Sequence, residues 1–215
     1  DRNGHLLAQR DFGPAPLLGL AFDPVQGMVY ICNLSTLAGV GASRIQRIAA
    51  AFNSATPIED VATIPGIGAP ANRTEPNPDG SSDTIIFGSN FAPAPNAVEF
   101  DQRGNLFVSD SFQGAIFRIA NVRTCSPGCV ATKFVQDPLL ATAGFPPFGA
   151  NGLAFNSDES ALFVANTGDD RVLRLDMASK RITVFAESIN GADGIVFDEQ
   201  GRLWVAANQA DEIVA

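Results

Sequence analysis

Asn151-Gly-Leu-Ala-Phe-Asn156 and Asp193-Gly-Ile-Val-Phe-Asp198 are two copies of one six-residue pattern, and this pattern decides the fold. Two weaker copies precede them, at Leu18-Gly-Leu-Ala-Phe-Asp23 and Asn96-Ala-Val-Glu-Phe-Asp101. Each copy leads through a turn into a second apolar strand that ends near a small polar residue. The pattern therefore predicts a repeated β-hairpin.

Further strands complete each repeat. Second strands are expected at 28–33, 105–110, 161–166 and 202–208, and third strands at 44–48, 115–119, 171–175 and 211–215. Fourth strands are expected at 60–64, 133–136 and 182–186. Groups of four short strands at a spacing of about 40 to 45 residues are typical of propeller blades. We therefore predict an all-β protein, a β-propeller of four-stranded blades with about four blades visible.

The repeats predict a single β-propeller domain over residues 1–215, interrupted by two long segments. Residues 65–95 are rich in Pro, Gly, Asn and Ser and are expected to form a long surface loop, with a degenerate hidden blade as the alternative. Residues 120–150 hold a loop insertion that contains Cys125 and Cys129.

The two ends of the chain leave two arrangements open. Residues 1–12 look like the outer strand of a preceding blade, and the last predicted strand runs to residue 215. The N-terminal strand completes the last blade and closes a four-bladed ring, or the chain is a fragment of a larger propeller. We favour the fragment, because propellers have about four to eight blades.

The amino-acid composition indicates which kinds of binding partner to expect. Acidic residues outnumber basic ones by 23 to 14, for a formal charge of −9. A phosphate-binding surface needs clustered Lys and Arg, so a nucleic acid is not expected. No long uncharged apolar run is present, so no membrane span is expected. We expect a small-molecule substrate or ligand, and the sequence does not determine the oligomeric state.

The three cysteines indicate in which cellular compartment the protein is expected. Cys125 and Cys129 flank a tight Ser-Pro-Gly turn that a short disulfide can close. Two free thiols or half of a metal site are the alternatives, and zinc is disfavoured because His5 is the only histidine. A disulfide implies an oxidising compartment, so we expect an extracellular or periplasmic location. Cys32 lies in an apolar run and is expected to be buried.

The last two repeats resemble a known family. Residues 151–166 and 192–206 look like consecutive blades of the senescence-marker/gluconolactonase/luciferin-regenerating-enzyme-like propellers, and the similarity extends more weakly to 96–100 and 18–22. Strictosidine-synthase-like, paraoxonase-like and NHL-type propellers share parts of the pattern. The resemblance implies a six-bladed propeller with a divalent cation, Ca²⁺ or Mg²⁺, in its central channel.

The resemblance also implies roles for particular residues. The family's metal ligands correspond here to Asn151 and Asp193, and the latter also serves in catalytic acid/base chemistry. Asn96 corresponds to an asparagine that contacts the substrate. Two positions depart from the family pattern, because Leu18 stands where the family has a ligand Glu, and Ala94 stands where an Arg is common.

The repeat itself brings the same residues together. Inner strands of a propeller run alongside its axis, so the leading residues Asn96, Asn151 and Asp193 should meet around one channel. Their oxygen atoms suit a hard cation better than zinc. The alternative is that they only cap turns by hydrogen bonding to the backbone.

Other polar segments are interpreted as structural. The residues that close the second strands are expected to be turn formers: Asn33, Asp110, Asn166 and Asn208. Residues 167–170 are expected to be a hairpin loop rather than a calcium loop, because they lack its alternating carboxylates. His5 is expected in an edge strand, away from any catalytic triad, and Trp204 in the core.

Two functions follow from the sequence. The first is a lactonase-like, metal-dependent hydrolase of a small lactone or ester, acting in the central channel. The second is a non-catalytic propeller that binds a ligand or a protein through the channel face and the loops, which the departures at Leu18 and Ala94 favour. A strictosidine-synthase-like protein with altered chemistry is a third possibility.

Overall fold

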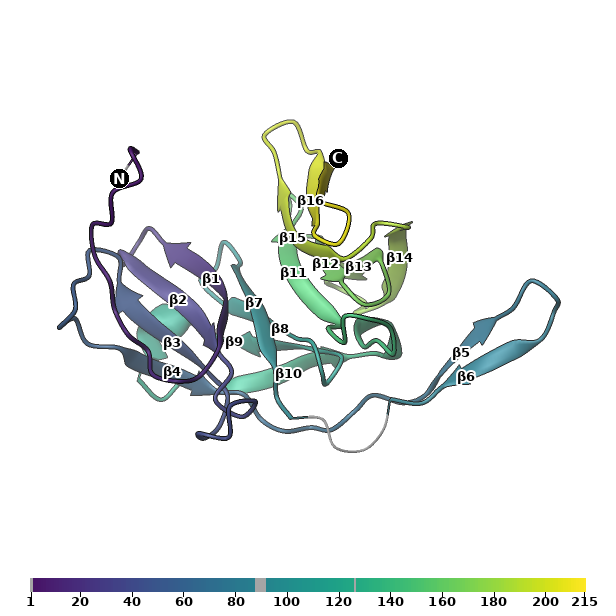
Figure 1. Ribbon diagram of the computed structural model, residues 1–215, viewed down its shortest axis with the longest axis horizontal. Helices are drawn as coiled ribbons and strands as arrows, with labels where there is room; N and C mark the ends of the chain where they lie inside the picture. The colour runs from purple at the N-terminus through teal and green to yellow at the C-terminus, as the bar shows by residue number, and fades with distance from the viewer. Residues whose placement is uncertain (1, 88–91, 126) are drawn as a thin grey trace.

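The computed structural model describes residues 2–87, 92–125 and 127–215. In this part of the chain, antiparallel strands form four sheets, together with one separate two-stranded hairpin. Consecutive strands pair within each sheet. Figure 1 shows the four sheets following one another along a curve, with the first strand of each on its inner side. The four sheets are the blades of a β-propeller.

Their bounds agree closely with the predicted strands. Blade 1 contains β1 (Leu17–Asp23), β2 (Met28–Asn33), β3 (Arg44–Ala49) and β4 (Glu59–Thr63). Blade 2 contains β7 (Pro95–Phe100), β8 (Leu106–Asp110), β9 (Ala115–Ile119) and β10 (Ala131–Gln136). Blade 3 contains β11 (Ala150–Phe155), β12 (Ala161–Asn166), β13 (Arg171–Asp176) and β14 (Ile182–Glu187). Blade 4 contains β15 (Ala192–Phe197), β16 (Leu203–Ala207) and β17 (Glu212–Val214).

The first hairpin of each blade turns through a residue in the left-handed region. Gly104 has φ of 79° and Gly201 has φ of 78°, a conformation that costs little without a Cβ. The third blade makes the same turn with Glu159, at φ of 54°. The local turn chemistry therefore recurs with the repeat, as the sequence predicts.

Aromatic pairs join one blade to the next. The phenylalanine near the end of β7, β11 and β15 packs edge-on against a ring from the second strand of the preceding blade. The pairs are Tyr30–Phe100, Phe107–Phe155 and Phe163–Phe197, with ring centroids 5.2, 5.3 and 5.1 Å apart. Edge-to-face rings at this distance are a favourable arrangement. One sequence position thus builds all three of these interfaces.

The N-terminal segment does not close the ring. Residues 2–12 form no strand, so the outer strand predicted for this segment is wrong, and with it the placement of His5 in an edge strand. The segment instead lies beside blade 1, where the Arg10 Nε donates to the Thr56 carbonyl over 2.9 Å. Figure 1 shows β1 and β15 at the two ends of the curve. That the chain is part of a six-bladed propeller stays a prediction.

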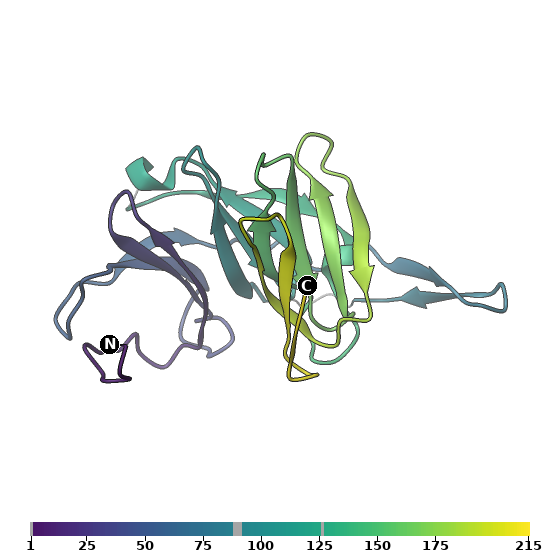
Figure 2. The same ribbon diagram turned by 90° about the horizontal axis from the view of Figure 1, so that it is seen from above.

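The segment from 65 to 95 contains a hairpin rather than loop alone. Strands β5 (Arg73–Pro76) and β6 (Ser82–Ile85) pair with each other and project from the blades (Figures 1 and 2). Arg73 anchors its base through an ion pair of 2.7 Å with Asp169 of blade 3. The alternative of a hidden blade is wrong for the described part of this segment, which leaves out residues 88–91.

The segment from 120 to 150 holds the predicted disulfide. Cys125, at the end of the short helix α1 (Val122–Cys125), bonds to Cys129, and Ser126 between them lies outside the described residues. After β10 the chain makes a single 3-10 turn, η1 (Pro138–Leu140). Cys32 is a free, buried thiol, as predicted. Neither α1 nor any other helix in the described residues has the length and apolarity to cross a bilayer.

Candidate functional site

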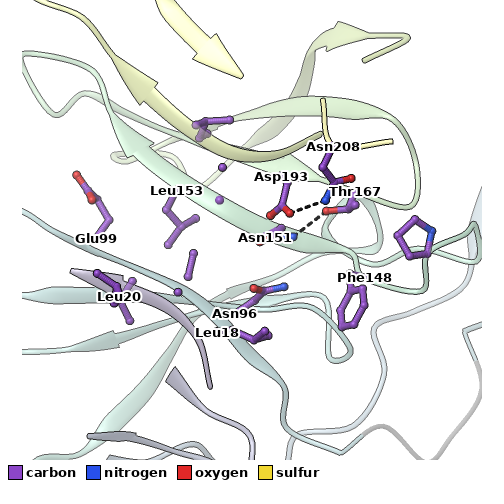
Figure 3. A pocket seen from close by; sticks show the side chains of 17 residues that line it. Leu18, Leu20, Asn96, Glu99, Phe148, Asn151, Leu153, Thr167, Asp193 and Asn208 are labelled. Carbon is purple, nitrogen blue, oxygen red and sulfur yellow. Dashed lines mark hydrogen bonds between the residues drawn. The ribbon is translucent and has the colours of Figure 1, made fainter. Parts of the chain in front are cut away.

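A cavity of about 520 Å³ lies where the first strands of the four blades meet (Figure 3). The three predicted site residues Asn96, Asn151 and Asp193 all line it, each from the inner strand of a different blade. The structure therefore brings these side chains together in the channel. Their roles in binding and catalysis stay predictions.

The inner strands carry an irregularity where these residues lie. In blade 3 the pairing of β11 with β12 shifts between Ala150 and Leu153, and the other inner strands shift at the equivalent place. Such bulges re-aim side chains, and they are common beside active sites. Gly152 lies within the shift, and a Cβ there would overlap the main-chain oxygen of Asp193. Glycine thus permits the close approach of blades 3 and 4 that sets the two site residues side by side.

Hydroxyl groups hold the two asparagines in place and link the blades. The Asn96 Nδ2 donates to the Ser111 Oγ over 2.9 Å, and that hydroxyl donates to the Ala150 carbonyl of the next blade over 2.7 Å. Asn151 Nδ2 donates to Thr167 Oγ1 over 2.8 Å, and Thr167 donates to the carbonyl that opens β15 over 2.8 Å. Because each amide nitrogen has an acceptor, the side-chain oxygens are available to a ligand.

Asp193 is the acidic side chain at this end of the cavity. The Asn208 Nδ2 donates to its Oδ2 over 2.6 Å (Figure 3). Burial raises the pKa of Asp193, while hydrogen bonds from Asn208 and Asn151 oppose the rise. No Lys, Arg or His occurs among the described residues that line the cavity, so no side-chain cation balances this carboxylate.

In blade 1 the equivalent channel position is apolar. Leu18 lines the cavity at the position equivalent to Asn96, and it packs against the apolar cluster between blades 1 and 2. Ala94, where the family commonly has an Arg, is buried in that same cluster, and its N–H donates to Asp110 over 3.1 Å. Neither Leu18 nor Ala94 supplies a charged group to the channel.

The donor set suits a hard cation only in part. No group of three or more His, Cys, Asp or Glu side chains that could hold a metal occurs in the described residues. Asp193 offers one carboxylate beside the amide oxygens of Asn96 and Asn151, and Glu99 lines the other end of the cavity. Oxygen ligands are those Ca²⁺ and Mg²⁺ prefer, and waters commonly complete their shells. The residues present fit Ca²⁺ or Mg²⁺ in the kind of their donor atoms, and the binding of either ion stays a prediction.

Sequence reasoning missed the residues that follow the second strands. Ser111 and Thr167 orient the asparagines, and Asn208 contacts Asp193 rather than only forming a turn as predicted. Ala207 pairs with Ala192 as Asn166 pairs with Ala150, so Asn208 corresponds to Thr167 and not to Asn166. The recurring polar residue one position after each of these strands was the available signal.

The remaining structural interpretations have mixed outcomes. Residues 167–170 form a turn, as predicted, in which Asp169 pairs with Arg73 and Arg171. Asp110 and Asn166 accept turn N–H groups, also as predicted. The prediction of a core position for Trp204 is wrong, because the side chain is only part-buried, on the face of blade 4 that also carries Val196 and Ile213, and its Nε1 donates to Asp198.

One family model matches the chain. It is described as the SMP-30/Gluconolactonase/LRE-like region, and it matches residues 143–215. This segment is similar to that family. It contains blades 3 and 4, and with them Asn151, Thr167, Asp193 and Asn208, whereas Asn96 precedes it. No curated protein matches the chain.

Several solved structures have a similar fold. A protein from Lactobacillus plantarum is 16% identical, with 89% of this chain and 50% of that chain covered and a TM-score of 0.53. Virginiamycin B lyase from Staphylococcus aureus is 15% identical, with 93% of this chain and 66% of the lyase covered and a TM-score of 0.48. A gluconolactonase from Xanthomonas campestris is 16% identical, with 90% of this chain and 74% of that chain covered and a TM-score of 0.42. At these identities the likeness shows the fold alone, and the chain spans half of the Lactobacillus protein and 66% of the lyase.

Proposed function

We propose that the chain provides the channel site of a lactonase-like hydrolase that opens a small lactone or ester. One observation carries the proposal: Asp193, Asn151 and Asn96 converge in one cavity, and the first two lie in the segment that matches the lactonase-containing family. Asp193 is the proposed acid/base, and Asn96 faces the substrate. The substrate, the dependence on metal and the activity itself belong to this proposal.

A divalent cation, Ca²⁺ or Mg²⁺, would be held by Asp193 and Asn151. When bound, it would polarise the carbonyl oxygen of the substrate and lower the pKa of a bound water. The absence of a basic side chain among the described lining residues supports this assignment, because the carboxylate then lacks any other counter-charge.

The chain's own residues account for the proton transfers. Asp193 accepts a proton from the water that attacks the acyl carbon, and it returns this proton to the alkoxide that leaves when the acyl C–O bond breaks. The product is a hydroxy acid from a lactone, or an acid and an alcohol from an ester. Burial raises the pKa of Asp193 and so favours its role as a proton carrier.

The cavity walls restrict the substrate. They include the side chains of Leu18, Leu153, Ile195, Pro146 and Phe148. Phe148 stacks on Phe112, with ring centroids 5.7 Å apart, so its ring is held in place. Such walls favour a substrate with an apolar ring or chain beside its ester group.

Hydrolysis of aldonolactones, alkyl lactones and aryl esters, measured with and without a chelator, tests the proposal. We expect activity that falls on chelation and is lost in Asp193→Asn, while Asp83→Asn on the exposed strand β6 leaves it unchanged. Calorimetric titration with Ca²⁺ and Mg²⁺ should show binding that Asp193→Ala weakens. No hydrolysis of any of these substrates by the intact protein would contradict the enzyme function.

The second candidate is a non-catalytic propeller that binds a ligand in the same cavity. Leu18 favours it, because it places a leucine where the family has a ligand carboxylate. Saturable binding of a lactone or ester with no turnover, in the presence of either cation, would select this function.

The disulfide supports an extracellular or periplasmic location. Disulfides persist in oxidising compartments and are rare in the cytosol. Intact mass of the protein isolated from its natural source, without reductant, should show Cys125 and Cys129 bonded. A fully reduced pair in that sample would contradict the proposed location.

A further inference from the structure

A second cavity, of about 450 Å³, is lined by residues of blades 2 and 3, which are neighbours along the curve in Figure 1. The turns that follow β7 and β11 contribute to its walls, whereas Asn96 and Asn151 lie near the start of those strands. In the described part of the chain it shares no lining residue with the channel cavity. A ligand of this cavity would therefore not compete directly with a ligand of the channel.

Three aromatic rings form the apolar wall of the second cavity. Phe107 of β8 is the central one, because its ring centroid lies 5.2 Å from that of Phe134 in β10 and 5.3 Å from that of Phe155 in β11. Phe107 is buried, and the other two rings are half-buried. Rings that hold one another in place offer a preformed surface to the apolar part of a ligand.

Arg118 of β9 supplies a cation beside these rings. It pairs across the sheet with Phe107, so both side chains lie on one face of blade 2. Its Nε is buried and has no hydrogen-bond partner, and no carboxylate among the described residues forms an ion pair with it. A buried charged donor without an acceptor is costly. The guanidinium is therefore suited to an acidic group that the chain does not itself provide.

Blade 1 shows which group fits an arginine at this position. Arg47 is the equivalent residue, since it pairs across the sheet with Tyr30. On the fourth strand opposite Arg47, the Oε2 of Glu59 lies 2.8 Å from both its Nε and its Nη2. The fourth-strand residue opposite Arg118 is instead Thr132, which is exposed and whose hydroxyl donates to the Arg118 carbonyl over 3.1 Å. Blade 2 thus repeats the arginine without its carboxylate.

The acidic residues around the cavity limit the charge of a ligand. Asp101, Asp158, Glu159 and Asp176 line it, and each already accepts a hydrogen bond from a main-chain N–H of a turn. Their negative charges oppose an anion of high charge, such as phosphate. A single carboxylate on an apolar body meets less repulsion and still satisfies the guanidinium.

We propose that this cavity binds a small aromatic monocarboxylate, whose carboxylate takes the place that Glu59 has in blade 1. Arg118 pairs with this carboxylate, a geometry for which the planar guanidinium is well suited, and the aromatic ring packs on the three phenylalanines. Arg103, which also lines the cavity and is exposed, adds positive charge. The site does not depend on hydrolysis in the channel.

Calorimetric titration of the intact chain with benzoate, phenylacetate and phenylpropanoate, in metal-free buffer, tests the proposal. At least one of these should bind saturably, and its alcohol analogue and inorganic phosphate should bind about tenfold more weakly or less. Arg118→Gln should weaken binding of the carboxylate about tenfold or more, because it removes the paired charge. Lys133→Gln removes an exposed charge outside the cavity and should leave binding unaltered.

Thr132→Glu provides the carboxylate from the chain itself. It should abolish binding of the aromatic carboxylates and raise the unfolding temperature, because the new side chain pairs with Arg118 as Glu59 pairs with Arg47. Val130→Glu adds the same charge at an exposed position outside the cavity and should do neither. Circular dichroism checks that each variant is folded. Binding of none of the three carboxylates to wild type, or binding that survives Arg118→Gln or Thr132→Glu, would overturn the proposal.

Discussion

Asn96 and Asn151 owe their orientation to the hydroxyl that follows the second strand of their blade. In both cases the amide nitrogen is bonded to that hydroxyl, and the hydroxyl in turn bonds to the next blade. The amide oxygen is thereby directed by contacts from two blades. A site built this way depends on the joints between blades as much as on the residues that face the ligand.

Replacement of Thr167 by Val should therefore affect both stability and site. It leaves the Asn151 Nδ2 and the Ala192 carbonyl without their partner, at a cost of about 1–3 kcal/mol in the free energy of unfolding. Denaturant unfolding measures this cost, and calcium titration measures the effect on the site. Thr132→Val removes an exposed hydroxyl on β10 and should cost much less. Equal effects of the two variants would show that the Thr167 hydroxyl, between Asn151 and the Ala192 carbonyl, has no special role.

Glu99 makes stability depend on pH. It lines the other end of the cavity, and burial, with a smaller effect from the nearby Glu159, raises its pKa from the ordinary value near 4.5 to about 7. The folded state then binds more protons than the unfolded state between these two values. Stability should fall as pH rises through this window and change no further above it.

Substitution of Glu99 by Gln isolates this effect. At pH 8 the variant should be more stable than wild type, by up to about 3 kcal/mol, and the two should converge near pH 4. Denaturant unfolding over a pH series measures the difference, and Glu199→Gln in an exposed turn serves as the control. A difference that does not change with pH would contradict the assigned cause.

At the scale of the strands, the repeat predicted nearly all of the pairing. Alternating apolar residues and turn residues are local signals, and β9 was placed to the residue. The errors arose where a neighbour in space decides the outcome. Residues 2–12, which carry only a few apolar residues such as Leu6 and Leu7, form no strand. In the fourth blade, β16 is one residue shorter at each end than predicted, and Asn208 corresponds to Thr167 rather than to Asn166.

Gly152 and Gly194 occupy equivalent positions and should respond differently to substitution by Ala. A methyl group on Gly152 would overlap the Asp193 carbonyl, so Gly152→Ala should destabilise by about 1–3 kcal/mol. Gly194→Ala has open space and should be near neutral or stabilise by up to about 1 kcal/mol. Thermal unfolding of the two variants in dilute solution makes the comparison. A similar loss in both would mean that the glycine does not serve the approach of neighbouring blades.

At the scale of the whole molecule, stability comes from the joints between blades. Buried apolar residues fall into three clusters, each of which joins one blade to the next. Each blade is a meander with short-range pairing, so the long-range contacts are concentrated at these joints and at the hairpin base. Loss of one joint should therefore weaken the fold more than loss of an equivalent residue on an exposed blade face.

Phe155 and Phe22 allow a direct comparison of a residue in a joint with an exposed residue at the same repeat position. Phe155→Ala removes a ring packed on Phe107 and should cost about 2 kcal/mol or more in the free energy of unfolding. Phe22→Ala alters the same repeat position on an exposed face and should cost well below that amount in dilute solution. Denaturant unfolding of both variants tests this. Equal losses would argue that the blades are stabilised individually rather than by their joints.

The sequence by itself determined the blade repeat and the three polar residues that lead the inner strands, because strand period, turn residues and repeat spacing are local properties of the chain. Only the tertiary structure decided that Thr167 and Asn208 orient the site, and that Ala94 is buried between blades. Each of these facts depends on which residues of a neighbouring blade come within contact distance, and no local pattern contains that information.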